Sequence, residues 1–235
     1  MIAGHRGVEV QADRVTRWLF GLFGVLGPIL FIGVFLWQGA TRPNYHPIKT
    51  FVSQLSLGDG GWMQIAFVIS GLLIAAFGLA MLVTRRPPLW GWIAVSVAGF
   101  GLIGAGCFVD DPWLGYPPGP GTPAGIGWPV SPHGWGHLLS AFFIFLGLDG
   151  AALFFAWAFA QRQRQCWYAY SVISAIAFPV LYVAALASGV ASGDPASPLG
   201  GYAGLFQRAS LVTGLAWVAL LAVHHLSSPQ TTDPP

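Results

Sequence analysis

The side chains best suited to binding or catalysis lie in four short polar segments that flank long apolar stretches. Hydroxyl, carboxyl, imidazole, amide and guanidinium groups can together donate and accept hydrogen bonds and carry both signs of charge. A fold that brings the four segments together would form a polar pocket. The candidate residues of this pocket are His46 and Ser53, then Asp110 and Asp111, then His133 and His137, and finally Gln207 and Arg208.

Two histidines are candidate metal ligands. His133 and His137 are four positions apart, so in a helix they would share one face. With Asp111 as a third ligand they could hold zinc or another divalent cation. Gly134 and Gly136 weaken a helix there, and the histidines could instead hydrogen-bond neighbouring loops. No cofactor is certain from the sequence, and a divalent metal, zinc in particular, stays a hypothesis.

Arg208 lies just inside the start of the last apolar stretch. A guanidinium at that position is costly unless it reaches water or finds a counter-charge. Asp110 and Asp111 end another apolar stretch at the same membrane edge. We therefore predict that Arg208 lies within salt-bridge or water-bridged reach of one of these acids, with His137 in the same pocket. The alternative is that Arg208 binds the anionic group of a ligand.

Asp149 is an acid inside an apolar stretch. It follows His137 by twelve residues, which places it roughly 18 Å deeper and about 120° around the same helix. Lipid cannot satisfy a carboxyl group, so we expect Asp149 to face other helices. Ser171 and Ser174 lie at similar depth and are candidate hydrogen-bond partners. A role in proton transfer is the functional alternative.

The elements that position these residues are membrane-spanning helices. Of 235 residues, 55% are hydrophobic and only 8% are charged, whereas soluble domains carry about 25% charged residues. We predict an all-α polytopic membrane protein with six transmembrane helices in a domain of residues 17–226. A polar cytoplasmic N-terminus of residues 1–16 precedes it and a flexible tail of residues 227–235 follows. The expected spans are residues 17–40, 62–84, 89–109, 134–160, 166–190 and 205–225.

The basic residues set the expected orientation. The N-terminal segment and the turns near residues 85–86 and 161–165 hold seven of the ten basic residues. Since positive charge is retained in the cytoplasm, both termini should be inside and the three longer connections outside. The net charge of +2 without a basic cluster excludes nucleic acid as an expected partner.

The first long connection carries apolar residues at helical spacing. Ile48, Phe51, Val52 and Leu55 would form one face of a short amphipathic helix. Such a helix could lie at the membrane surface or fold back over the bundle. It would then be either a lid that presents His46, Lys49 and Ser53, or an anchoring segment.

Four motifs carry a family resemblance. They are Arg42-Pro-Asn-Tyr45 with Ser53-Gln-Leu-Ser56, then Gly106-Cys-Phe-Val-Asp110-Asp111-Pro112, then His137, and last Gly204-Leu-Phe-Gln207-Arg208. Taken in this order, they resemble the prokaryotic membrane proteins of domain of unknown function family 998. The resemblance implies the six-span topology, a prokaryotic plasma membrane and the location of a site, but no reaction.

Two looser resemblances concern other membrane families. The Frag/DRAM/Sfk group also has six spans and a serine-containing segment after the first. The CREST hydrolases use serine, aspartate and three histidines around zinc, and the order His46, Ser53, Asp111, His133, His137 is similar to theirs. Those hydrolases have seven spans, however, and their ligands lie within helices.

These observations leave several functions open. The first hypothesis is an outward-facing pocket that binds a lipid head group or another amphiphile, with Arg208 supplying positive charge and the first long connection covering it. The second is an intramembrane metal-dependent hydrolase at the same site. The third is a small-molecule or proton-coupled transporter that uses Asp149. A purely structural subunit is the fourth. Membrane lipid is the expected partner in each case, and whether the protein is an enzyme is open.

Overall fold

The computed structural model describes residues 2–59 and 61–227, with side chains from Trp18 onward. Its helices account for most of this length, and the described part of the chain has no strand. A single short 3-10 helix, η1, lies in the first long connection. The elements are α1 (Ile2–Thr41), η1 (Val52–Ser56), α2 (Gly61–Val83), α3 (Leu89–Cys107), α4 (Pro132–Gln161), α5 (Gln165–Ala191) and α6 (Ala203–Ser227).

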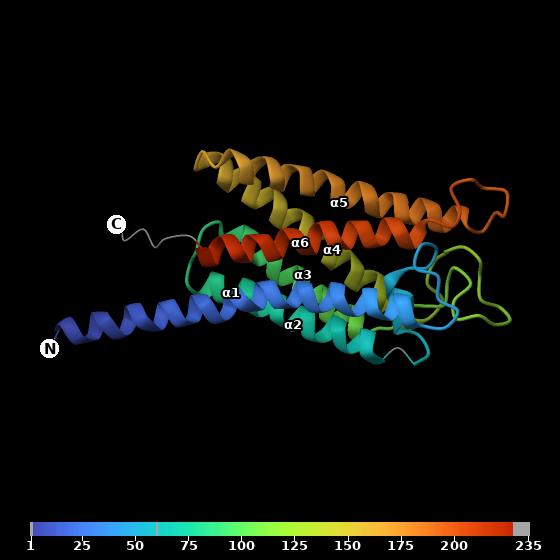
Figure 1. Cartoon of the computed structure of the whole chain (residues 1–235), viewed down its shortest axis with the longest axis horizontal. Helices are drawn as coiled ribbons and strands as arrows, with labels where there is room; N and C mark the ends of the chain where they lie inside the picture. Colours follow the sequence, from blue (N-terminus) through green and yellow to red (C-terminus); the bar gives the residue numbers. More distant parts are fainter. Residues whose placement is uncertain (1, 60, 228–235) are drawn as a thin grey trace.

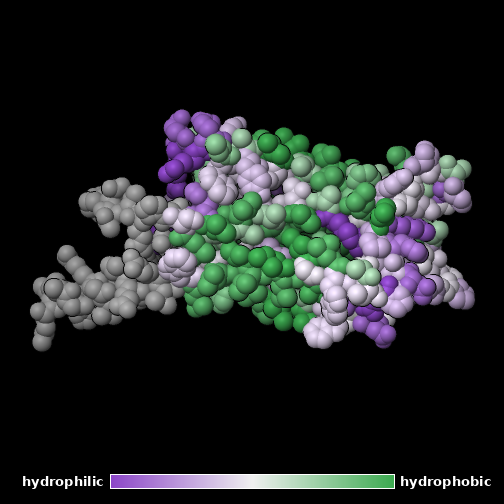
Figure 2. Space-filling view, in the orientation of Figure 1, coloured by the Kyte–Doolittle hydropathy of each residue, from purple (hydrophilic) through white to green (hydrophobic). Residues whose placement is uncertain are grey.

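The six-span prediction is confirmed. Within the described residues, six helices are long and apolar enough to cross a membrane. Helices are the expected form because hydrocarbon offers no partner to backbone N–H and C=O groups, which must bond within the segment. In Figure 2, hydrophobic residues cover the middle of the visible face and hydrophilic residues gather at its two ends. This band is the surface that faces lipid.

The helices form a closed ring. Each packs against its neighbours in the chain, and α6 returns to pack against α1. Figure 1 shows the long connections gathered at one end of the bundle and the short turns at the other. We call these the loop end and the turn end. The loop end consists of residues 42–59, 108–131 and 192–202.

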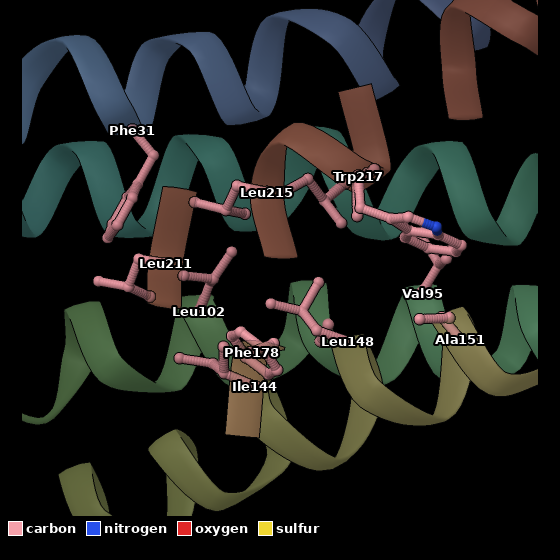
Figure 3. Close-up of a cluster of buried hydrophobic side chains, with 14 of the residues drawn as sticks. Phe31, Val95, Leu102, Ile144, Leu148, Ala151, Phe178, Leu211, Leu215 and Trp217 are labelled. Carbon is pink, nitrogen blue, oxygen red and sulfur yellow. The ribbon is translucent and has the colours of Figure 1, made fainter. Parts of the chain in front are cut away.

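The interior of the ring is filled by large apolar side chains. Phe31, Leu102, Leu148, Phe178 and Trp217, from five different helices, are all buried. Figure 3 shows them directed into one common cluster. The glycines of α3 bring helix backbones together, as the sequence predicts. At Gly101, for example, a Cβ atom would lie only 2.7 Å from the backbone nitrogen of Ile144 in α4.

Helix α4 is the longest of the five helices that follow α1, with 30 residues. At about 1.5 Å per residue it is some 45 Å long, so it must tilt or protrude. Figure 1 shows α4 beside α5 at the turn end and diverging from it toward the loop end. This divergence creates the space in which the candidate site lies.

The structure describes the segments at the two ends of the predicted domain to different extents. Helix α1 begins at Ile2, so the polar N-terminal segment continues the first spanning helix without a break. Of the predicted tail, residues 227–235, only the first residue belongs to the described part of the chain.

The first long connection contains a short helix, η1, but it lacks the predicted amphipathic character. Instead of one buried face, all five residues of η1 are buried, and Ile48 is exposed. The reason is that the polar residues Ser53 and Gln54 also have partners inside the protein, as described below. Helix η1 is therefore packed into the loop end on every side, as in the alternative in which the segment folds back over the bundle.

Candidate functional site

Asp110 is the centre of a hydrogen-bond network that joins η1 to the end of α3. The Ser53 hydroxyl and the Gln54 side-chain amide both donate to Asp110 Oδ2, each at 2.9 Å. Gln54 also donates to the carbonyl of Asp111 and accepts a bond from the backbone N–H of Trp113, again at 2.9 Å. Gln54 is fully buried, so these bonds fix the position of η1 relative to Asp110.

Asp111 has a different role, because its carboxylate anchors the start of α4. Oδ2 accepts bonds from the backbone N–H groups of Val130 at 2.8 Å and Ser131 at 3.2 Å. Ser131 in turn caps α4 by accepting from Gly134 N–H at 2.9 Å. A Cβ atom at Gly134 would collide with the Asp111 carboxylate, which explains a glycine in the first turn.

The environment of Asp111 lowers its pKa. Burial alone would raise this pKa, but hydrogen bonds from Ser131 and from the backbone of Val130 and Ser131 outweigh burial, and His137 adds an electrostatic contribution. The carboxylate is thus held ionised beside the positive end of the α4 dipole.

We expect Asp111→Ala to lower the free energy of unfolding by about 2 kcal/mol at neutral pH, because two backbone donors lose their acceptor. A depressed pKa contributes stability above the ordinary carboxyl pKa of 3.8 and loses it as pH falls toward the folded-state value. The difference between wild type and variant should therefore shrink below pH 3.8. Unfolding midpoints in detergent at neutral and acidic pH measure this; a difference that grows on acidification would contradict it.

His137 is buried, and its ring orientation is fixed. Its Nδ1 lies 2.8 Å from the backbone carbonyl of Phe108. Because a carbonyl can only accept, Nδ1 carries a proton, and in the neutral ring Nε2 is then a hydrogen-bond acceptor. The ring also packs edge-on against Phe67. His137 is thereby oriented as a fixed polar group in the wall of a cavity.

This cavity, the α4/α5 cavity, has a volume of about 560 Å³. Its polar lining residues are Ser53, Asp110, His137, Tyr182 and Gln207. Four of these are candidates from the sequence, and they come from η1, α4, α6 and the connection that follows α3. The remaining lining residues are Phe51, Trp113, Ile126, Gly127, Trp128, Pro129, Leu138, Ala141, Phe145, Leu186 and Val190.

The cavity extends along the diverging parts of α4 and α5. Its lining residues on α4 run from His137 to Phe145, and those on α5 from Tyr182 to Val190. The rings of Phe145 and Tyr182 stack at 3.5 Å between centroids and close the deep end. Eight residues of helix correspond to a depth of about 12 Å.

Arg208 does not line this cavity, and a direct salt bridge to Asp110 or Asp111 is absent from its contacts with the described residues. Among the contacts of the described residues, its Nη1 donates to the carbonyls of Pro47, Thr50 and Gly204, and its Nη2 donates to the Tyr45 hydroxyl. Neither Asp110 nor Asp111 is a partner. The guanidinium finds its acceptors in the backbone of the first long connection, which it fastens to the start of α6.

Tyr45 and Gln207 also hold the first long connection in place. Tyr45 is buried and its hydroxyl lies 3.0 Å from the Thr50 carbonyl and 2.9 Å from that of Phe51. Burial raises the pKa of Tyr45 to about 12, although the neighbouring Arg208 opposes this shift. Gln207 accepts a bond from the backbone N–H of Val52 at 2.6 Å, so it holds η1 as well as lining the cavity.

The remaining candidates lie apart from the cavity. His46 is exposed in the first long connection, and His133 is exposed with its ring against Phe108. Asp111 is committed to the start of α4. Among the described residues, no three or more histidine, cysteine, aspartate or glutamate side chains form a group that could hold a metal ion. The zinc hypothesis on His133, His137 and Asp111 stays a prediction.

Asp149 is half-buried on α4. It lines a small void with Leu148, Ser174, Phe178 and Trp217, among others, from α4, α5 and α6. Its Oδ1 has no hydrogen-bond partner among the described residues, and no bond from Asp149 to Ser171 or Ser174 is found there. Ser171 instead accepts a bond from the Trp217 indole at 3.1 Å.

Sequence reasoning missed three residues of the site. Gln54 and Tyr45 are in the motifs that carry the family resemblance, but neither was a candidate for a role. Tyr182 lies within an apolar stretch where only its hydroxyl marks it. The position of Gln54 and Tyr45 inside short motifs is the signal that could have identified them.

A model of the family described as "Protein of unknown function (DUF998)" matches residues 25–224, from the first helix to the sixth. Neither the curated proteins nor the solved structures contain a match to the chain. The matched range includes every residue that lines the α4/α5 cavity.

Proposed function

The chain belongs to DUF998, a family of membrane proteins of unknown function, and we propose that it binds an amphiphilic molecule in the α4/α5 cavity. The observation that carries this proposal is the cavity's composition. It combines fixed polar groups at the loop end with apolar walls inside the spanning helices. A volume of about 560 Å³ lies in the range of small-molecule sites, roughly 300–1,000 Å³.

The polar part of the cavity suits a head group. Asp110, Ser53 and His137 come from three different elements, and the hydrogen bonds described above fix each of them before a ligand arrives. Fixed polar groups reduce the entropy lost on binding and define the orientation of the ligand. Gln207 adds an amide from α6 to the same wall.

The apolar part of the cavity suits a hydrocarbon chain that enters from the membrane. Leu138 of α4 is 38% exposed, and Leu186 and Val190 of α5 are 37% and 63% exposed. These residues line the cavity while also reaching the lipid-facing surface. A molecule in the adjacent leaflet can therefore reach the cavity sideways, between α4 and α5, without passing through water.

We further propose that the loop end faces outward in a prokaryotic plasma membrane. The support is the distribution of basic residues, with Arg85, Arg86, Arg162 and Arg164 all in the two short turns at the turn end. The cavity's depth of about 12 Å is close to half the thickness of the hydrocarbon core, so the ligand would come from the outer leaflet. The orientation stays a prediction.

Filling the cavity tests the binding proposal. Ala141 lies in its wall, so Ala141→Trp should occupy part of the space and reduce the amount of amphiphile that co-purifies with the protein by about tenfold or more. Ala187→Trp is the matched control, since Ala187 is exposed on α5 and does not line the cavity. Lipids are extracted from each purified variant and quantified per mole of protein by mass spectrometry.

An equal unfolding midpoint for the two tryptophan variants shows that both are folded. The proposal requires that only Ala141→Trp loses the bound amphiphile. Retention of the same molecules at wild-type level by a folded Ala141→Trp variant would show that they bind elsewhere on the helices.

A further inference from the structure

The charge in the α4/α5 cavity is negative. Asp110 is the one charged side chain among the described residues that line it, and no lysine or arginine is in that wall. This differs from the sequence-based expectation, in which Arg208 supplies positive charge to the pocket. The charge of the wall bears directly on which head group the cavity can accept.

The partners of Asp110 are neutral and leave it able to bind more. Its Oδ2 accepts from Ser53 and Gln54, and its Oδ1 accepts from the backbone N–H of Asp111. A carboxylate offers about four acceptor positions, so roughly one remains open. Among the described residues, no ion pair with a basic side chain neutralises Asp110.

Two basic side chains at this end of the bundle are bonded to other groups, and a third, that of Lys49, does not line the cavity. Arg208 donates to backbone carbonyls and to Tyr45. Arg42 donates to the side chain of Gln38 at 2.9 Å and to the carbonyl of Leu55 at 3.1 Å. An anionic head group would therefore meet a like charge in the cavity without a cation to offset it, which is unfavourable at a site partly shielded from water.

The geometry points to an amphiphile with a positively charged amino group, which pairs with Asp110 while its chain lies between α4 and α5. This inference rests on the proposed function and specifies its ligand. The aromatic rings of Phe51, Trp113 and Tyr182 line the same cavity and add surfaces that attract cations. A small hydrated metal ion is a poorer match, because most of the lining is apolar and the cavity is large.

Three probes with the same chain separate the head-group charges: dodecylamine, dodecanoic acid and dodecanol. Each is titrated into the full-length protein in a neutral detergent, and binding is read by native mass spectrometry. Dodecylamine should bind wild type more tightly than the other two. Asp110→Asn keeps an acceptor oxygen but removes the charge, so it should weaken dodecylamine binding by roughly tenfold to a hundredfold. Asp194→Asn, at an exposed position of the loop end, is the charge-matched control and should bind like wild type.

The outcomes distinguish this inference from the proposed function. If dodecanol or dodecanoic acid binds as tightly as dodecylamine, and Ala141→Trp abolishes that binding, the cavity holds an amphiphile but the inferred head group is wrong. If dodecylamine binding is the same in Asp110→Asn and wild type, the inferred pairing is overturned. If Ala141→Trp affects none of the probes, both the inference and the proposed function fail. A wild-type unfolding midpoint for Asp110→Asn ensures that lost binding does not reflect lost folding.

Discussion

Replacing Arg208 by alanine should lower the free energy of unfolding by about 3 kcal/mol or more. The guanidinium supplies hydrogen bonds to the carbonyls of Pro47, Thr50 and Gly204 and to Tyr45. Charged hydrogen bonds of this kind contribute about 1.5–3 kcal/mol each when a partner is removed, and several are lost together. The backbone of the first long connection would be left without its donors at the start of α6.

Arg208→Lys should recover only part of this loss. An ammonium keeps the charge, but it cannot reproduce the planar fork that reaches carbonyls and a hydroxyl at once. The lysine variant would also lose the packing of the guanidinium over the Tyr45 ring, whose centre lies 5.3 Å from the guanidinium carbon. This loss lowers the free energy of unfolding further. Unfolding in detergent, followed by tryptophan fluorescence, gives the three free energies.

A double-mutant comparison identifies the true partner of Arg208. Since Arg208 and Asp111 share no contact, the costs of Arg208→Ala and Asp111→Ala should add to within about 0.5 kcal/mol. Arg208→Ala and Tyr45→Phe should instead be non-additive, because the hydroxyl and the guanidinium are bonded. Coupling of Arg208 with Asp111 but not with Tyr45 would restore the salt bridge expected from the sequence and contradict the structure.

Changing Gln54 to glutamate should be at least as damaging, with a cost of about 3–5 kcal/mol. Gln54 is fully buried and donates to Asp110 and to the carbonyl of Asp111. Glutamate has nearly the same shape, but it loses both donated bonds and places a second carboxylate beside Asp110. Two like charges in a buried site repel strongly, so η1 should detach from the end of α3.

Gln38→Glu is the matched control, because Gln38, in the last turn of α1, is also buried. Its Oε1 already accepts a bond from Arg42 at 2.9 Å. The same substitution there places a carboxylate against a cation, so it should be close to neutral in stability. Similar unfolding midpoints for Gln54→Glu and Gln38→Glu would show that Asp110 is not the charge that Gln54 meets.

The contrast between Arg208 and the six spans shows what the sequence can predict. Long apolar blocks define membrane helices because lipid admits few alternatives, so their number and approximate ends follow directly. Arg208 was assigned acidic partners because side-chain charges are visible in a sequence. Its actual acceptors are mostly backbone carbonyls, which every residue possesses, and only the folded path of residues 45–51 brings them into range.

The candidate site was partly predictable for a related reason. Ser53, Asp110, His137 and Gln207 occur at one end of their helices, so a common depth could be inferred, and the structure places all four in the wall of one cavity. The cavity itself depends on the divergence of α4 from α5, which side-chain packing determines and no local pattern records. Asp111 was grouped with Asp110 by adjacency, although successive residues in an extended segment point to opposite sides.

An experimental structure of the full-length protein in lipid nanodiscs would show whether the α4/α5 cavity holds an amphiphile. We expect elongated density in this cavity, with its polar end beside Asp110 and His137 and its chain reaching toward Phe145. In the same experiment on Ala141→Trp, that density should be absent while the helices keep their positions. A wild-type cavity in which α5 has closed against α4, or one that holds only isolated water-sized peaks, would contradict the claim that this cavity binds an amphiphile.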